Sequence, residues 1–142
     1  MNISNWLNTS SCVEKIASIF GGSVPRLDEL LFDRIQLEQN GNVSMFLIKK
    51  TLPPEAPMKW FIKNHDAIQI ILEFSGVRKI SVAANFGEQY HAQYCQIRSW
   101  VQESKFFEVK AEDLCVTLEF AFFNVRFAPF SLQDSEDLPI TL

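Results

Sequence analysis

The sequence predicts a mainly β protein of about eight mostly antiparallel strands, with one helix near its N-terminal end. Apolar and polar residues alternate along most of the chain after residue 30, and the segments that alternate are joined by short connections. Short connections favour antiparallel neighbours, because a parallel pair needs a long crossover. Phenylalanine is abundant, with 13 in 142 residues, and large rings suit the half-buried surface of a sheet. A meander and a sandwich-like sheet both fit this pattern.

The expected helix precedes the strands. Val13, Ile16 and Phe20 recur at helical spacing. Ser11 to Glu14 fits a capping box, in which the serine hydroxyl accepts from a free backbone amide and the glutamate reaches back. Gly21 stands where a helix commonly ends, since glycine adopts the left-handed conformation without strain. The helix therefore ends before the first strand.

The first two strands are predicted to form a hairpin, 30–39 with 43–50. Between them stands Asn40-Gly41, a dipeptide typical of tight hairpin turns because both residues tolerate positive φ. Strict alternation predicts one face of the first strand made of Leu31, Asp33, Ile35 and Leu37. Because an unpaired carboxylate is rarely buried, we expect Asp33 to lie in water at the strand end.

The rest of the chain supplies a loop and six further strands. Leu52 to Pro57 contains three prolines and is expected to be a rigid loop. The predicted strands are 68–74, 79–85, 91–101, 106–111, 114–121 and 123–130. At this length the chain fits one domain, which we place at 1–130. Residues 131–142 form an acidic, loose C-terminal tail.

Composition excludes several classes of function. The net charge of −4 argues against a nucleic-acid-binding protein, which usually carries a basic patch. The chain has three cysteines, Cys12, Cys95 and Cys115. An odd number at wide spacing is typical of a protein from a reducing compartment, in which cysteines stay unpaired. The first residues lack the features of a signal peptide, and no segment is long and apolar enough to span a membrane. We therefore expect a cytoplasmic protein.

The sequence contains no recognisable catalytic or metal-binding pattern. His91 and Cys95 are four residues apart, but on a strand that separation is about 13 Å, too far for one zinc ion. His65 has no ligand-type neighbour at useful spacing. Cysteines in apolar strands are usually inert, and Gly21-Gly22-Ser23 follows a helix instead of opening one, unlike a phosphate-binding loop. We expect no enzymatic activity, no metal and no cofactor.

The strongest surface feature lies on the strand around residues 90–101. One of its faces carries the residues Tyr90, Tyr94, Gln96, Arg98 and Trp100. Tyrosine, tryptophan and arginine are enriched where proteins bind one another most strongly. Glu103 follows on the adjoining loop, so the end of this strand is expected to be exposed to solvent. Two interpretations stay open: the face binds a partner, or it packs beneath another layer.

Three short motifs carry a resemblance to a known family. They are Pro25-Arg26-Leu27, then Pro57-Met58-Lys59-Trp60, then Leu72-Glu73-Phe74-Ser75-Gly76-Val77. Together with the order of helix, hairpin, proline loop and strands, they resemble the immunity protein 50 family of bacterial polymorphic toxin systems. The resemblance covers residues 12–130 and implies a cytoplasmic protein that binds and neutralises a cognate toxin. It brings no catalytic residues.

The family motif residues Pro57, Lys59, Trp60, Phe74 and Gly76 are interpreted as structural. Trp60 either fills the core or contacts the toxin, and we favour the core because a rigid proline segment precedes it. A mildly acidic surface suits a basic toxin such as a nuclease, although solubility alone also explains the charge.

Two other functions remain as alternatives. A small-ligand-binding β domain would have its phenylalanines around an apolar pocket of a few hundred cubic ångströms. A structural subunit of a larger assembly would expose an apolar patch and self-associate.

Overall fold

The structure, a computed structural model, describes residues 29–52, 57–63, 65–87 and 93–131. Within them the prediction of a mainly β fold is confirmed. The elements are β1 (Leu30–Leu37), β2 (Val43–Lys49), α2 (Met58–Ile62), β3 (Ala67–Ser75), β4 (Lys79–Ala84), β5 (Tyr94–Gln102), β6 (Ser104–Lys110), β7 (Leu114–Phe120) and β8 (Phe122–Phe130). The short helix α2 was not predicted, and the predicted N-terminal helix and acidic tail lie outside the described residues.

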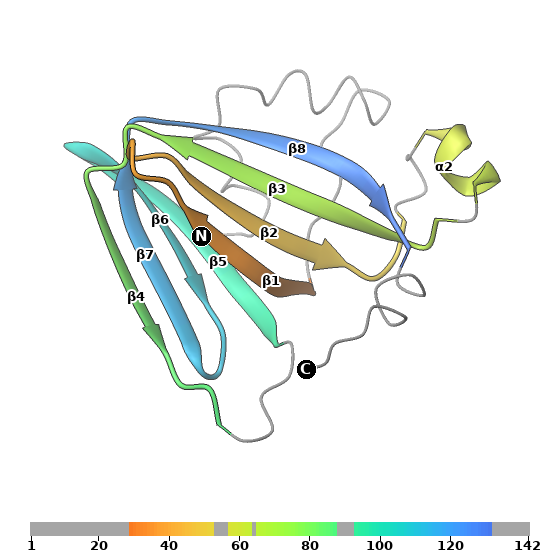
Figure 1. Cartoon of the computed structure of the whole chain (residues 1–142), viewed down its shortest axis with the longest axis horizontal. Coiled ribbons are helices and arrows are strands. Elements are labelled where there is room, and N and C mark those ends of the chain that lie inside the picture. Colours follow the sequence, from red (N-terminus) through yellow and green to blue (C-terminus); the bar gives the residue numbers. More distant parts are fainter. Residues whose placement is uncertain (1–28, 53–56, 64, 88–92, 132–142) are drawn as a thin grey trace.

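The eight strands form one open sheet in the order β4-β7-β6-β5-β1-β2-β3-β8, and every pairing among them is antiparallel. We call β1, β2, β3 and β8 half A, and β4, β5, β6 and β7 half B (Figure 1). The halves join through a short contact between β1 and β5, where Leu30 lies opposite Cys95 and Leu31 opposite Tyr94. The two halves are therefore joined by far fewer paired residues than the strands within each half.

At one end of the sheet the chain crosses between the halves twice. It leaves half A where β3 turns into β4, and it returns where β7 turns into β8 (Figure 1). The two crossings touch, since the Ala121 N–H donates to the Ser75 carbonyl oxygen over 3.2 Å. Gly76 has φ +65°, and a Cβ built on it would lie 2.8 Å from the Cβ of Ala121. This close approach leaves room only for glycine at position 76.

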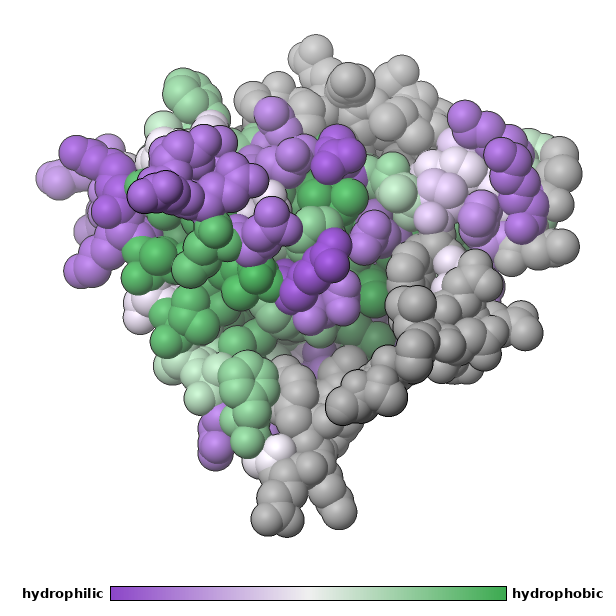
Figure 2. Space-filling view, viewed as in Figure 1, coloured by the Kyte–Doolittle hydropathy of each residue, from purple (hydrophilic) through white to green (hydrophobic). Residues whose placement is uncertain are grey.

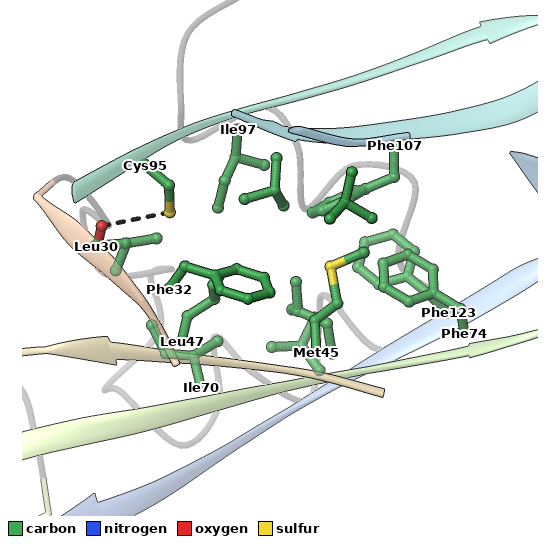
Figure 3. Packing of buried hydrophobic residues seen from close by; sticks show 14 of the residues in the cluster. Leu30, Phe32, Met45, Leu47, Ile70, Phe74, Cys95, Ile97, Phe107 and Phe123 are labelled. Carbon is green, nitrogen blue, oxygen red and sulfur yellow. Dashed lines mark hydrogen bonds between the residues drawn. The ribbon is translucent and has the colours of Figure 1, made fainter. Parts of the chain in front are cut away.

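The hydrophobic core lies between the two halves. Figure 3 shows Ile97 and Phe107 of half B pointing toward Met45, Leu47 and Phe74 of half A. Phe74 is 1% exposed and its ring centroid lies 5.0 to 5.1 Å from those of three other rings, Phe107, Phe120 and Phe123. Such ring pairs stabilise by about 0.5–1.5 kcal/mol each beyond simple burial. Four of the phenylalanines thus form a packed aromatic centre.

The predicted hairpin is confirmed, because β1 and β2 pair from Leu30↔Lys49 to Leu37↔Val43. Gly41 adopts φ +86° in the turn, as the Asn-Gly dipeptide predicts. The Asn42 N–H donates to the Asn40 side-chain oxygen over 3.2 Å. The turn therefore fixes the register of the two strands.

The predicted alternation along the first strand is wrong. A bulge lies between Phe32 and Arg34, and the extra residue, Asp33, is exposed. A bulge shifts which face the following side chains occupy. Phe32 and Ile35 therefore both contact the main core, whereas Leu31 lies on the opposite face of half A, in a second cluster with Ile48 and Ala67. Asp33 stays in contact with water, as expected.

Trp60 anchors α2 to the body of the protein. The helix follows Pro57, whose carbonyl oxygen accepts from the Trp60 N–H over 2.9 Å. Trp60 is 7% exposed and belongs to the main core cluster, while Lys59 beside it is exposed. This places the Lys-Trp motif at the edge of the core, with its ring inward and its charge outward.

Candidate protein-binding surface

The outer face of half B carries a cluster of aromatic and charged side chains, opposite the core. Residues of β5 alternate between buried and exposed, so Cys95 and Ile97 point inward while Tyr94 and Arg98 point outward. The strand register sets Arg98 opposite Glu108 and Trp100 opposite Phe106 on β6. We call Arg98, Trp100, Phe106 and Glu108 the aromatic–arginine surface.

Arg98 is held in place from two sides. Its Nε donates to a Glu108 carboxylate oxygen over 2.8 Å, and its second contact to the other oxygen is 3.4 Å. Its guanidinium carbon lies 4.8 Å from the centroid of the Trp100 ring. The hydrogen bond to Glu108 and the charge of that carboxylate raise the pKa of Arg98. The guanidinium is therefore oriented before any partner arrives, although its side chain is 61% exposed.

Trp100 extends this surface through a stacked pair of rings. Its centroid lies 5.4 Å from that of Phe106, with only 11° between the ring planes. Both residues are half-buried, so part of each ring stays open to solvent. Tryptophan and arginine are residue types that are enriched at strong protein–protein contacts.

The other predicted partner-binding residues lie apart from this pair. Tyr94, 57% exposed, stands at the beginning of β5, with the Lys50 ammonium 6.0 Å from its ring centroid. Glu103 is exposed in the turn between β5 and β6, where it adopts φ +62°. Tyr90 lies outside the described residues. The structure thus brings together Arg98 and Trp100 and spreads Tyr94 and Glu103 to either end of β5.

Sequence reasoning missed Phe106 and Glu108, which complete the surface. The prediction began the next strand at Phe106 and treated Glu103 and Lys105 as loop. In the structure Gln102 pairs directly with Ser104, so a single residue, Glu103, makes the turn. If the sequence had been read with a tight turn at Glu103, counting residues back along both strands would have placed Glu108 opposite Arg98.

The charges on this surface nearly balance. Arg98 is paired with Glu108, whose carboxylate also accepts from the Thr117 hydroxyl over 3.4 Å. At the edge of half B, Arg78 lies 3.6 Å from Glu119. The aromatic–arginine surface is therefore not an acidic patch, and the net charge of −4 is a property of the whole chain.

The described residues offer no group of three or more histidine, cysteine or acidic side chains that could hold a metal ion. Cys95 is 6% exposed and its thiol donates to the Leu30 carbonyl oxygen over 3.3 Å (Figure 3). Burial raises the pKa of Cys95 to about 12, so at neutral pH it is a protonated, unreactive thiol. The Nδ1 atom of His65 is buried without a hydrogen-bond partner, and His91 lies outside the described residues.

Among the described residues, the central phenylalanines fill the core; they are Phe74, Phe107, Phe120 and Phe123. The rings around Phe74 are in mutual contact. A shallow depression of about 360 Å³ lies instead at the end of half B, between Ala83–Asn85 and the turn at Lys110–Cys115. This packing counts against the alternative of a phenylalanine-lined ligand pocket.

The fold and this surface define a small β-sheet protein with a restrained arginine beside stacked aromatic rings on the outer face of half B. No helix in the described part of the chain is long and apolar enough to cross a membrane. The family model of immunity protein 50 matches residues 13–128, most of the chain. The protein therefore belongs to the immunity protein 50 family, as its motifs predicted. No curated protein and no solved structure matches it.

Proposed function

We propose that this protein binds a cognate bacterial toxin in the cytoplasm and neutralises it by forming a stoichiometric complex. The observation that carries the proposal is membership of the immunity protein 50 family over residues 13–128. An immunity protein acts by binding and blocking, so the proposal requires a rigid scaffold with an accessible surface and requires no catalytic group of its own.

The aromatic–arginine surface is the part of the protein that we assign to toxin contact. A side chain loses conformational freedom when it binds, which costs about 0.5–1.5 kcal/mol for a flexible residue. Arg98 is already restrained by Glu108 and Trp100, so less of that cost remains. Trp100 and Phe106 lie in a stacked pair and contribute apolar area without rearrangement.

The charge of the chain favours a basic toxin, and nucleases are one class of this kind. Opposite net charges accelerate encounter between proteins and make association sensitive to salt. The aromatic–arginine surface itself is balanced in charge, so we assign steering to the chain as a whole. Contact at the surface would then depend on shape, rings and the oriented guanidinium.

The proposal is tested by isolating the toxin and measuring its affinity for variants. The tagged full chain is used to capture its partner from native cells. The captured protein is then purified and titrated calorimetrically against the wild type, Arg98→Ala and Trp100→Ala. Arg126→Ala serves as the matched control. Arg126 is also an exposed arginine in an ion pair, since its side chain is 63% exposed and its Nε lies 2.6 Å from a Glu73 carboxylate oxygen. It lies in half A, outside the aromatic–arginine surface.

We expect a one-to-one complex in which Arg98→Ala and Trp100→Ala each weaken binding by at least about 30-fold, the size of a strong interface contact. Arg126→Ala should bind like the wild type. Equal affinities for all four proteins would remove the site assignment while leaving the toxin proposal intact. Failure to retain any stoichiometric partner would remove the toxin proposal itself.

A further inference from the structure

The two edge strands of the sheet, β8 and β4, differ in the residues that discourage pairing with another chain. β8 is one edge strand; it contains Pro129, which has no amide N–H, and the charged Arg126. Proline and charge are the usual protection of an edge against pairing with another chain. β4, the other edge, contains no proline, and its one charged residue is Lys79 at its first position. Among the described residues, no strand pairs with the outer edge of β4.

The backbone of β4 offers a regular set of hydrogen-bonding groups. The Asn85 N–H donates to the Asp113 carbonyl oxygen over 2.9 Å, so position 85 faces the neighbouring strand β7. Along an antiparallel strand the bonding direction alternates from one residue to the next. Counting back, the amides and carbonyls that point away from β7 are those of Ile80, Val82 and Ala84.

The same part of the molecule exposes apolar side chains. Val82 is 47% exposed and Phe86, just beyond the strand, is 69% exposed. Figure 2 shows hydrophobic surface over the region that β4 and β7 occupy in Figure 1. Exposed apolar area beside an open strand edge marks a surface that gains stability when it is covered.

The charges at the two ends of this edge decide what covers it. Lys79 stands at the beginning of β4, next to Arg78, which is paired with Glu119. Glu112 and Asp113 stand in the turn beside the end of β4. One end is basic and the other acidic, so an identical edge running in the opposite direction is complementary to it. A two-fold related copy presents such an edge.

We propose that β4 pairs antiparallel with β4 of a second copy, about a two-fold axis at Val82, so that the two sheets form one continuous sheet. With Val82 opposite itself, Ile80 lies opposite Ala84, and all the outward groups meet as hydrogen-bonding pairs. Lys79 then lies opposite Asn85 of the second copy. In the second copy, Asn85 lies beside the turn that carries Glu112, at the spacing of one strand, about 4.8 Å. An extended Lys79 side chain can therefore reach Glu112 of the second copy.

This pairing joins only six residues from each copy, so the dimer is expected to be weak and concentration-dependent. Sedimentation velocity on the full chain over a concentration series tests it. We expect the mass to rise from 16.3 kDa toward twice that value in the micromolar range. A single 16.3 kDa species up to millimolar concentration would overturn the proposal.

Two sets of variants locate the interface. Val82→Pro removes an amide that does not bond to β7, so it should abolish the dimer while circular dichroism shows an unchanged fold. Lys79→Glu and Glu112→Lys should each weaken self-association by about tenfold, because each places like charges at both symmetric contacts. An equimolar mixture of these two variants should restore a dimer, since both contacts then join opposite charges.

Each contrary result has a defined meaning. A dimer that persists in Val82→Pro would place the interface elsewhere and overturn the proposal. So would a mixture of Lys79→Glu with Glu112→Lys that associates no better than either alone, because the antiparallel register would be wrong. If the chain is monomeric and Val82→Pro instead weakens toxin binding, the edge belongs to the toxin and the second copy is overturned as its occupant.

Discussion

Replacing Gly76 by alanine tests how the two halves of the sheet are connected. Gly76 has φ +65°, and a residue with a Cβ in the left-handed region costs about 1–2 kcal/mol. The new Cβ would also lie 2.8 Å from the Cβ of Ala121, an approach that forces one crossing away from the other. Overpacking of this kind costs about 1–3 kcal/mol. We therefore expect the free energy of unfolding to fall by about 2–5 kcal/mol.

Gly41→Ala is the matched control for that variant. Gly41 has φ +86°, but a Cβ there would meet nothing nearer than the Val77 carbonyl oxygen at 3.7 Å, which is ordinary contact. This variant should therefore lose only the conformational part, about 1–2 kcal/mol. Both are measured by urea unfolding of the full chain, followed by far-ultraviolet circular dichroism.

A double-mutant cycle separates the steric part from the conformational part. Adding Ala121→Gly to Gly76→Ala removes the clash and should recover about 1–3 kcal/mol relative to the sum of the single changes. If Gly76→Ala costs no more than Gly41→Ala, or if the cycle shows no coupling, then the close approach of the two crossings does not limit position 76.

Three further predictions concern buried side chains. Trp60→Ala should lower the free energy of unfolding by about 3–5 kcal/mol, whereas Lys59→Ala beside it should change that energy by less than about 0.5 kcal/mol; equal effects in urea unfolding would show that Trp60 does not fill the core. Cys95 should resist iodoacetamide in the native state longer than Cys115, as mass spectrometry of labelled peptides would report, because burial raises its pKa to about 12. The folded state holds the Cys95 proton more tightly than the unfolded state, whose pKa is near 9.0, so the stability that this provides is complete below the unfolded value and is lost as pH rises toward the folded one. Cys95→Ala should show a smaller loss of stability than the wild type between about pH 8 and about pH 10.5, and an identical loss would contradict this cause.

Much of the fold could be predicted because several strands bury one face and expose the other. The alternation of apolar and polar residues in β6 and β7 is visible in the sequence and agrees with their burial, whereas β3 is buried on both faces. The Asn40-Gly41 turn could be recognised because the conformation it requires suits few other residues. These features depend on local sequence alone.

The order of the strands could not be predicted from local sequence. β1 pairs with β5 through only two residue pairs. β8 pairs with β3 although the whole of half B lies between them in the sequence. Nothing in a short segment specifies such neighbours. The bulge at Asp33 was missed for a related reason, since an extra residue in one strand is visible only when its partner strand is known.

The candidate site was predicted in part, because the outward residues of β5 follow from its alternation. What alternation cannot supply is the neighbour across the hairpin, and Glu108 is the residue that orients Arg98. Trp100 was assigned to the correct face, but its stacking on Phe106 depends on the register that the turn at Glu103 sets. The sequence thus predicted which residues face outward and left their arrangement undetermined.

The most direct test of toxin neutralisation is the growth of bacteria that express the captured toxin domain together with this protein. We predict that the wild type and Arg126→Ala restore growth, while Arg98→Ala and Trp100→Ala, expressed at the same level and folded, restore it only in part. Growth arrest that the wild-type protein fails to relieve, at a level sufficient to bind all of the toxin, would contradict the proposal that this chain is an immunity protein for that toxin.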